Sequence, residues 1–555
     1  MAANPIPVRD DIVAEVTASY LDSLDVTNLP ELKELKEQLF TVTVERLRLL
    51  NSSIAKDVQL QLPSGLTEDQ IYQVLNKLYN VRRVACSTAN SSPELDILCV
   101  YRDEGPDKGL YVDNTLVLSK IIRSLNRDIS ARGIANVMDM LRESAPRVYR
   151  TSAPNLIAVN NGIFDYDTKA LMDFSPDYVF LSKSRVDYNP NAVNVVIHND
   201  DDGTDWDVES WMHELSDDPE IVQLLWEILG AVVRPFVPWN KSAWFYSNKG
   251  NNGKGTLCSL MRNLVGKDSY AAVSLSDFSK DFMLEPLVRS TAIIVDENDV
   301  GVFIDKAANL KAVVTGDVIQ INRKFKPAFA FQFHGFMIQC LNEFPRIKDK
   351  SDSFYRRQLF VPFEKCFTGR ERKYIKADYL QRQEVLEYVL KRVLNMDYYQ
   401  LSDPSACREA LSEYKEFNDP VLQFLTEVLP DAKWNLLPYS FLYDLYKSWY
   451  KDNIPMGKPQ SKSTFQFDLR AALDVSGRTL GWYDGGKSRF RSGPHMIGPE
   501  PLIAKYDLTA WYNPNYKSGS DVMKKCLPEL NEFYSGIMRY TPIPMYPTGR
   551  PDDDD

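Results

Sequence analysis

The spacing of hydrophobic and polar residues changes several times along the chain. Over the first 110 residues, apolar side chains recur at helical spacing, as in Leu32, Leu35 and Leu39, with Glu and Lys between them. The pattern then becomes mixed as far as about residue 216. Between about residues 219 and 414, short apolar runs alternate with helical spacing. That alternation is typical of a mostly parallel sheet flanked by helices, so we expect an α/β fold class for this part.

The same changes divide the chain into five parts. Asn418-Asp419-Pro420 marks a turn at which the α/β pattern stops, and a smaller helical region with a Gly-rich stretch follows it. A chain of 555 residues has room for roughly three or four domains. We expect an N-terminal helical accessory region, a mixed module, the α/β domain, a small helical domain and a C-terminal tail, at residues 1–110, 111–216, 217–415, 416–510 and 511–555.

A Gly-rich loop stands between a strand and a helix in the α/β part. Residues 242–247 form a candidate buried strand, and Leu257, Leu260 and Leu264 repeat at helical spacing after the loop. Backbone N–H groups of such a loop converge with the helix N-terminus on phosphate oxygens, and Lys254 would add its charge to the β- and γ-phosphates. The expected ATP-binding residues are Asn248, Lys249, Gly250, Asn251, Asn252, Gly253, Lys254, Gly255 and Thr256.

The loop departs from the usual phosphate-binding pattern at two positions. Asn248 stands where the first glycine is usual, and Gly255 follows the lysine where a magnesium-binding Ser or Thr is usual. An asparagine adopts the left-handed backbone conformation more readily than most residues, so we expect Asn248 to replace that glycine. Thr256, one place later, is then the best candidate for the magnesium ligand. A plain Gly-rich turn is the alternative interpretation of the segment.

Two further apolar strands end in polar groups that suit a nucleotide site. Residues 291–295 lead to Asp296 and Glu297, of which the first would position magnesium and the second would polarise the attacking water. Another strand ends at Asn342, which would bind the γ-phosphate or that water, or else begin a turn. Because ligands of open α/β sheets bind at the carboxyl ends of the strands, these groups are expected to meet.

Two arginines, Arg356 and Arg357, precede a fourth apolar strand. One of them is a candidate to reach the γ-phosphate of a neighbouring subunit and neutralise charge in the transition state, whereas an ordinary surface ion pair is the alternative. The expected catalytic residues are therefore Lys254, Asp296, Glu297, Asn342, Arg356 and Arg357, with Thr256 and Asp296 as metal ligands and with ATP and Mg²⁺ as cofactors.

A basic hairpin is predicted between the carboxylates and Asn342. Residues 318–321 and the alternating Phe329, Phe331 and Phe333 predict two strands, joined by a tip rich in positive charge. Cations bind phosphates and an aromatic ring stacks on a base, so such a tip suits contact with single-stranded nucleic acid. The alternative interpretation is a solvated turn without a binding function. The expected DNA-binding residues are Arg323, Lys324, Phe325 and Lys326.

Composition narrows the class of protein without naming it. The net charge is −11, so a nucleic-acid partner would need a local basic surface. The seven cysteines are scattered without a Cys-x-x-Cys pair, and we expect neither a zinc site nor a disulfide framework. Apolar runs fall well short of the roughly 20 residues that cross a membrane, and no signal pattern begins the chain. We expect a cytoplasmic protein that does not bind membranes.

The order of these motifs resembles that of superfamily 3 (AAA+) helicases. More narrowly, it resembles the phage and plasmid primase-associated family that is related to the poxvirus primase-helicase. The resemblance covers roughly residues 80 to 510. It is carried by residues 250–256, 293–298, 310–317, 323–326, 341–342 and 356–363, with the upstream segment 158–164 and the downstream segments 418–421 and 442–450.

The resemblance implies an AAA+ P-loop ATPase core at 217–415, a family N-terminal module at 111–216 and a winged-helix DNA-binding domain at 416–510. It implies a homo-oligomeric ring, usually a hexamer, that threads single-stranded DNA past central hairpins, with Lys324, Phe325 and Lys326 at their tips and arginine fingers supplied in trans. The winged helix would bind duplex DNA, such as an origin, or else pack with a solvated basic face. Its basic residues are Lys447, Lys451, Lys458, Lys462, Arg470, Lys487, Arg489 and Arg491.

The resulting hypothesis is an ATP-dependent replicative DNA helicase of a phage or mobile genetic element, acting in a bacterial host cytoplasm with primase or other replication proteins as possible partners. One alternative is a primase-helicase with an unrecognised primase site, for which Glu94-Leu95-Asp96 is the nearest carboxylate pair, although no Ser-x-His follows it. The other is an ATP-dependent initiator that assembles on DNA without unwinding it, an idea that the unusual Gly255 supports.

Overall fold

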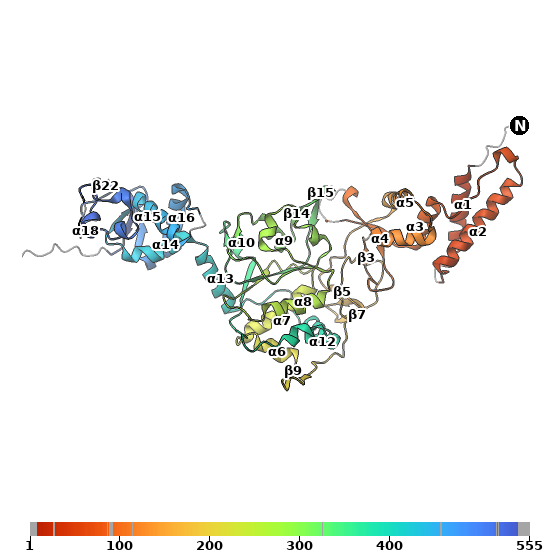
Figure 1. Cartoon of the computed structure of the whole chain (residues 1–555), viewed down its shortest axis with the longest axis horizontal. Helices are drawn as coiled ribbons and strands as arrows, with labels where there is room; N and C mark the ends of the chain where they lie inside the picture. Colours follow the sequence, from red (N-terminus) through yellow and green to blue (C-terminus); the bar gives the residue numbers. More distant parts are fainter. Residues whose placement is uncertain are drawn as a thin grey trace, which may run out of the picture. The chain divides into compact units, whose positions relative to one another are not determined.

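The structure, a computed structural model, describes residues 8–25, 28–85, 87, 93–113, 115–324, 326–454, 458–517, 519 and 521–541. The chain folds into two compact units, residues 1–411 and 412–555, and mixes helices with sheets throughout (Figure 1). The boundary between the units lies within helix α13 (Ser405–Phe417), which also contains the end of the predicted α/β domain at residue 415.

Helices dominate the first part of unit 1. Leu35 and Leu39 lie on one buried face of their helix, as the sequence predicted, and Thr67 and Gln70 form a capping box that begins the third helix. A four-stranded sheet in the order β3-β2-β1-β4 packs with these helices. The elements are α1 (Arg9–Asp22), α2 (Leu32–Asn51), α3 (Glu68–Leu78), β1 (Val81–Val84), β2 (Ile97–Tyr101), β3 (Tyr111–Val112), α4 (Thr115–Leu125), α5 (Ala131–Ser144) and β4 (Arg147–Val148).

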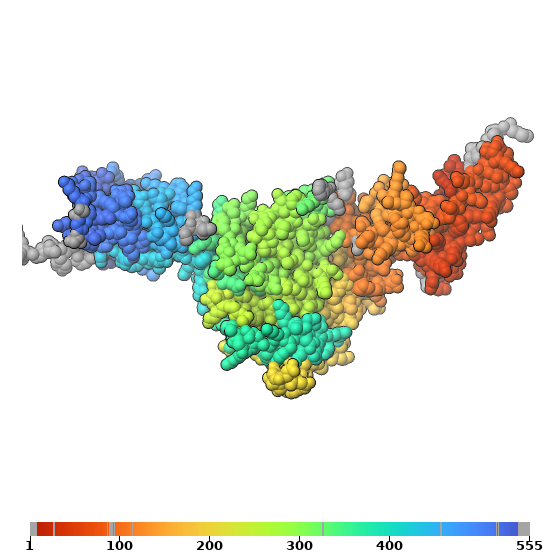
Figure 2. All heavy atoms as spheres, viewed as in Figure 1, coloured from red at the N-terminus to blue at the C-terminus, as the bar shows by residue number. Residues whose placement is uncertain are grey.

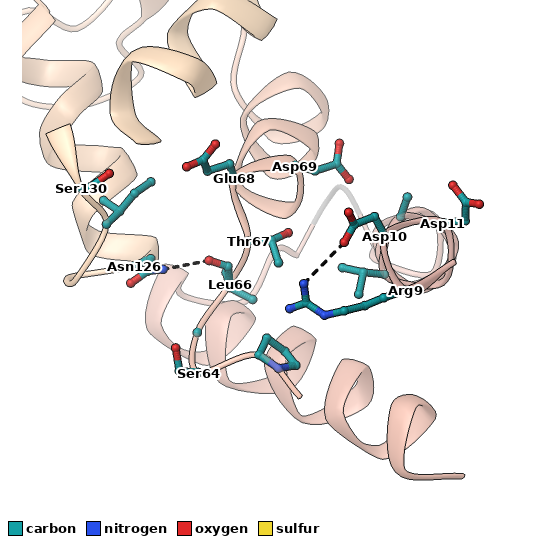
Figure 3. Close-up of a pocket in the computed structure, with 15 residues that line it drawn as sticks. Arg9, Asp10, Asp11, Ser64, Leu66, Thr67, Glu68, Asp69, Asn126 and Ser130 are labelled. Carbon is teal, nitrogen blue, oxygen red and sulfur yellow. Dashed lines mark hydrogen bonds and ion pairs between the residues drawn. The ribbon is translucent and has the colours of Figure 1, made fainter. Parts of the chain in front are cut away.

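A cavity of about 690 Å³ opens among the starts of α1, α3 and α5 (Figure 3). Arg9 pairs with Asp10 at its edge, 3.5 Å apart, and the Asn126 side chain donates to the Leu66 carbonyl at 2.9 Å. Its lining also includes Asp11, Glu68 and Asp69. The carboxylates make the cavity predominantly acidic, so it does not suit a phosphate group.

Short hairpins follow in the mixed module. Strands β5 and β6 pair across a turn at Asn160 and Asn161, as the sequence predicted. The β8–β9 hairpin lies against residues 374–379, where the Tyr374 hydroxyl donates to Asp202 at 2.7 Å, and the two segments adjoin at the lower edge of the view in Figure 2. The elements are β5 (Leu156–Val159), β6 (Gly162–Asp165), β7 (Ala170–Met172), β8 (Ile197–Asn199), β9 (Thr204–Trp206) and α6 (Val208–Glu214).

The core of unit 1 is a five-stranded sheet in the order β11-β12-β16-β10-β18, with every neighbouring pair parallel. All six residues of β16 and all four of β12 are buried, which explains why their sequences are almost entirely apolar, with Gln339 of β16 as the exception. The predicted parallel sheet is confirmed. Its strands and main helices are α7 (Pro219–Val233), β10 (Ser242–Tyr246), α8 (Lys254–Val265), β11 (Tyr270–Ala271), β12 (Ala292–Val295), α9 (Ala308–Thr315), β16 (Phe336–Leu341), α10 (Asp352–Tyr355), β18 (Gln358–Pro362), α11 (Lys373–Ala377) and α12 (Gln383–Leu394).

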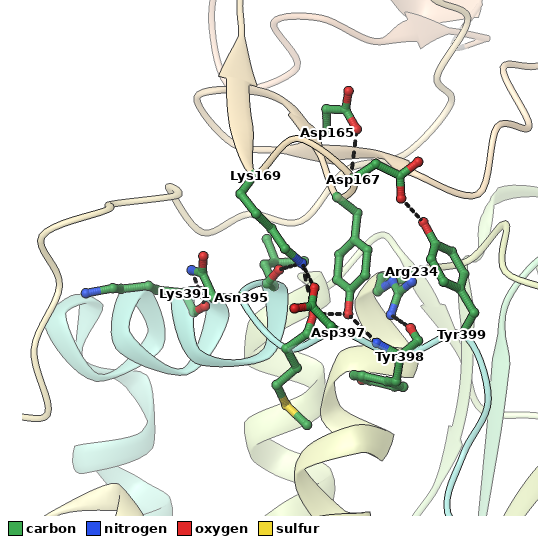
Figure 4. Close-up of polar contacts among 12 residues, drawn as sticks. Asp165, Asp167, Lys169, Arg234, Lys391, Asn395, Asp397, Tyr398 and Tyr399 are labelled. Atoms are coloured by element: carbon green, nitrogen blue, oxygen red, sulfur yellow. Dashed lines mark hydrogen bonds and ion pairs between the residues drawn. The ribbon is translucent and has the colours of Figure 1, made fainter.

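A buried arginine ties the mixed module to this core (Figure 4). Arg234 follows α7, is fully buried, and donates through Nη1 to the Tyr398 carbonyl at 2.7 Å. Its guanidinium carbon lies 3.4 Å from the ring centroid of Tyr166 and 4.7 Å from that of Tyr399. Nearby, the Lys169 ammonium reaches the Met396 carbonyl at 2.9 Å. The Arg234 charge is thus held by a carbonyl and by aromatic rings, whereas Lys169 also pairs with Asp397 at 2.9 Å.

Unit 2 is a small mixed domain with an aromatic core. Asp419 caps α14, whose first residue is Pro420, and Phe424 packs edge-on against Tyr446. Strand β23 is the middle strand of the sheet β19-β23-β20, although it lies beyond residue 510, so this domain extends into the predicted tail. The main elements are α14 (Pro420–Val428), β19 (Leu436–Pro438), α15 (Tyr439–Asn453), α16 (Lys462–Leu480), β20 (Trp482–Asp484), β21 (Phe490–Arg491), α17 (Leu502–Lys505), α18 (Val522–Lys525), β22 (Phe533–Tyr534) and β23 (Gly536–Arg539).

Candidate nucleotide-binding site

The Gly-rich loop joins the carboxyl end of β10 to the start of α8, as predicted. Gly253 is the N-cap of α8 with φ 86°, and a Cβ added there would lie 2.6 Å from the Leu215 side chain. Glycine is therefore required at this position both for its conformation and for its size. The left-handed asparagine of the loop is Asn251, with φ 52°, and not Asn248 as the sequence led us to expect. The turn occurs three residues later, next to the helix.

Lys254 connects the loop to the end of β16. Its side chain is buried, with 5% exposure, and its Nζ donates to the Leu341 carbonyl and to Oδ1 of Asn342, both at 3.0 Å. Burial lowers the pKa of Lys254 below its usual value. The structure therefore brings together two predicted residues that lie 88 positions apart in the sequence. An ammonium held by neutral oxygens keeps its charge available for a phosphate.

The predicted carboxylates follow β12, and an arginine that the sequence interpretation missed lies beside them. Asp296 forms an ion pair with Arg262 of α8 at 2.9 Å, and the hydrogen bond from that guanidinium holds the pKa of Asp296 below its usual range. Glu297 is exposed. The Asp296 carboxylate therefore stays ionised near neutral pH, as a metal ligand must.

Asn298, the next residue, is a structural link that we did not predict. It is buried, its amide donates to Gln339 Oε1 at 2.9 Å and to the Cys340 carbonyl at 3.1 Å, and it accepts from the Leu275 N–H at 3.0 Å. These bonds fasten the end of β12 to β16. They fix the distance between the strands that carry Asp296 and Asn342.

A covering segment, residues 366–376, lies over the loop. The Phe367 N–H donates to the Asn251 carbonyl at 2.7 Å, and the Asn251 amide donates to Glu371 at 3.0 Å. Together with α6 it encloses a cavity of about 220 Å³ that Thr256 and Gly253 also line. The sequence interpretation missed this segment, because nothing in its pattern links it to a loop that lies far earlier in the chain.

The two arginines have different environments. Arg357 folds back onto the preceding helix α10, where its guanidinium contacts the Ser353 carbonyl and donates to the Ser353 hydroxyl at 2.8 Å. Its backbone carbonyl accepts from the Ser242 N–H at 2.8 Å. Arg356 is exposed at the end of α10. Of the pair, Arg356 has the side chain that is available to a partner.

The basic hairpin exists with the predicted strands, β14 (Val318–Arg323) and β15 (Lys326–Gln332). Phe329 and Phe331 are buried, so they anchor the hairpin, whereas Lys324 at the tip is exposed. The Arg323 guanidinium lies 4.4 Å from the Phe329 ring centroid and lines a cavity of about 780 Å³. Phe325 and the Lys326 side chain lie outside the described residues.

Three family models match successive parts of the chain. "D5 N terminal like" matches residues 77–230, "Poxvirus D5 protein-like" matches residues 416–500, and a family of unknown function (DUF5906) matches residues 245–357. The last of these contains the loop, both carboxylates, Asn342 and both arginines. Because the family that covers the site has no known function, this match assigns no role to the site.

Individual proteins are similar at a low level. The curated "Putative helicase 121R" of Invertebrate iridescent virus 3 is 24% identical over 347 residues, covering 54% of this chain and 35% of that protein. The match thus spans about a third of the relative's length. An apo structure of the NrS-1 C-terminal region has a TM-score of 0.38 at 12% identity, covering 82% of this chain and 92% of that one. Another, of residues 305–718, gives 0.37 at 13%, covering 74% and 89%.

The two D5 matches and the helicase-named viral relative support a relationship with the primase-helicase-like D5 proteins. Within the described residues, no helix is both long and apolar enough to span a bilayer.

Proposed function

We propose that this chain is an ATP-dependent DNA helicase of a phage or other mobile element. The observation that carries the proposal is the contact of Lys254 with Asn342, 3.0 Å apart, at the carboxyl ends of neighbouring parallel strands. That edge of an open parallel sheet is where such folds bind ligands, and a Gly-rich loop leading into a helix suits phosphates. The order of the motifs and the D5 relationship supply the rest of the argument.

Each residue then has a role in hydrolysis. The loop amides and Lys254 bind the phosphates, Glu297 polarises the attacking water, and Asn342 contacts that water or the γ-phosphate. Asp296, ionised beside Arg262, and the Thr256 hydroxyl are oxygen donors of the type that Mg²⁺ prefers. Magnesium bound there would neutralise charge on the β- and γ-phosphate oxygens. Arg356 would act on the site of a neighbouring subunit.

The wider architecture belongs to the same proposal. We infer an AAA+ core, a homohexameric ring with the basic hairpins around single-stranded DNA, and a winged-helix domain in unit 2 that binds duplex DNA. The exposed Lys324 at the hairpin tip and the basic residues of unit 2 support contact with DNA. Primase or other replication proteins would be partners.

Strand displacement tests the proposal directly. Wild-type protein with ATP and Mg²⁺ is expected to release the labelled strand of a forked DNA substrate. Protein that hydrolyses ATP on DNA but releases no strand would instead favour the initiator. Synthesis of primers from a template and nucleotides would favour the primase-helicase.

The magnesium ligand can be tested by removing one hydroxyl. Thr256→Val keeps the shape of the side chain, so it is expected to leave folding unchanged. It should raise the Mg²⁺ concentration for half-maximal hydrolysis by at least roughly 10-fold, because even the loss of an outer-shell partner of a metal ligand has an effect of that size. Titration of hydrolysis with Mg²⁺ measures this. Thr426→Val is the control, because it removes an exposed helical hydroxyl that bonds the Leu422 carbonyl in α14, outside the site. An unchanged Mg²⁺ dependence of Thr256→Val would exclude Thr256 as the ligand.

The hairpin makes a separate prediction about DNA. Lys324→Ala is expected to weaken single-stranded DNA binding several-fold and to reduce the slope of log affinity against log salt by about 0.7, because one phosphate contact is lost. Fluorescence anisotropy at several salt concentrations measures both. Lys348→Ala removes an exposed lysine that pairs with Asp305, and serves as the control. An unchanged slope would place the DNA path elsewhere.

A further inference from the structure

The ammonium group of Lys376 lies close to Gly255, the position at which the phosphate loop has no side chain. A Cβ built on Gly255 would lie 3.9 Å from Nζ of Lys376, and no other atom of the described structure lies within 4 Å of it apart from the chain neighbours and the backbone of its own helix. The backbone of Gly255 is not left-handed. Neither conformation nor packing therefore requires glycine at this position. The small size of Gly255 leaves space beside the loop, and the Lys376 ammonium lies next to that space.

Lys376 is brought there by the covering segment. It lies on α11, and its side chain lines the same cavity as Gly253 and Thr256. The hydrogen bonds of Asn251 to the backbone of Phe367 and the side chain of Glu371 fix the segment on the loop. Within the described part of the chain, Lys376 has no carboxylate within ion-pair distance. Its exposed ammonium is therefore free to meet an anion.

In the usual form of this motif, a Ser or Thr at the position of Gly255 binds magnesium, so Lys376 brings a positive charge next to the position where that ligand is missing.

We propose that Lys376 is a second phosphate-binding lysine, which its own chain supplies to the triphosphate in the space that Gly255 leaves open. This inference rests on the proposed function of the loop as an ATP site. Nucleotide binding would then depend on two lysines from different segments, Lys254 at the start of α8 and Lys376 in the covering segment. It would also depend less on magnesium than in a site where the metal supplies that charge.

The test is binding of a fluorescent non-hydrolysable ATP analogue, with Mg²⁺ and with EDTA, to the full chain. Lys376→Gln is expected to weaken binding roughly 10- to 100-fold, the size of a lost charge-assisted hydrogen bond, with the larger loss in EDTA. Lys376→Arg should retain most of the affinity. Lys267→Gln, which removes an exposed lysine beyond the far end of α8, is the control and should bind like wild type. Thermal unfolding checks that each variant is folded.

A double change sharpens the experiment. Gly255→Ser in the Lys376→Gln background restores the usual magnesium ligand, so binding should recover with Mg²⁺ but not with EDTA. If Lys376→Gln binds like wild type in both conditions while Lys254→Ala loses binding, the role of Lys376 is refuted and the ATP site stands. If Lys254→Ala also binds like wild type, the ATP site itself is refuted.

Discussion

Lys254→Ala is expected to reduce ATP hydrolysis to near background and to abolish strand displacement. Its ammonium is the buried charge of the loop, held by the Leu341 carbonyl and Asn342, and it would donate to the phosphates as charge develops. Loss of such a donor lowers turnover by roughly 100- to 1,000-fold. Release of phosphate and displacement from a forked substrate measure the two activities.

Folding must be separated from chemistry in this variant. Removal of the ammonium takes one hydrogen bond from the Leu341 carbonyl, which still accepts from the Ser247 N–H at 3.2 Å, so the loss costs only about 1 kcal/mol and the variant should remain folded but unfold at a slightly lower temperature. Lys267→Ala, just beyond the opposite end of the same helix, controls for loss of a lysine. A folded Lys254→Ala protein with wild-type hydrolysis would show that the loop is not the nucleotide site.

The sequence predicted the core of the fold because buried parallel strands leave continuous apolar runs. β10, β12, β16 and β18 all fall on largely apolar runs, and only in β16 does a polar residue, Gln339, interrupt the run between apolar neighbours. It also predicted the meeting of Lys254 with Asn342, since both follow the carboxyl ends of strands that prove to be neighbours. Where a functional group sits at the end of a patterned strand, its position follows from the pattern.

The contacts that complete the site could not be predicted in this way. Arg262 reaches Asp296 from within a helix. In the sequence, nothing distinguishes it from an arginine on the solvent-exposed polar face of a helix. Lys376 reaches the loop because a segment folds back after β18, and loop paths depend on tertiary contacts that leave no periodic pattern. The extent of unit 2 could not be predicted either. Strand β23 is only four residues long, and its partners β19 and β20 come much earlier in the chain, so no local pattern indicates the pairing.

Because Arg356 and Arg357 have different environments, their replacement is expected to have different effects. Arg356→Ala is expected to remain folded and to lower hydrolysis about 1,000-fold, because an exposed arginine that neutralises transition-state charge in a neighbouring site contributes on that scale. Arg357→Ala should instead lower the thermal stability, because its guanidinium is bound to Ser353 within α10. Hydrolysis assays and thermal unfolding of the two purified variants separate the roles.

Mixing variants shows whether Arg356 acts between subunits. Neither Lys254→Ala nor Arg356→Ala should hydrolyse ATP alone, but in a mixed ring some interfaces pair an intact Lys254 with an intact Arg356. Equal amounts of the two variants are therefore expected to recover a substantial part of the wild-type hydrolysis after they exchange subunits. Recovery should vanish at concentrations where the protein is monomeric. A mixture that stays inactive although both variants assemble together would place Arg356 outside the neighbouring site and would leave the trans arginine to another part of the chain.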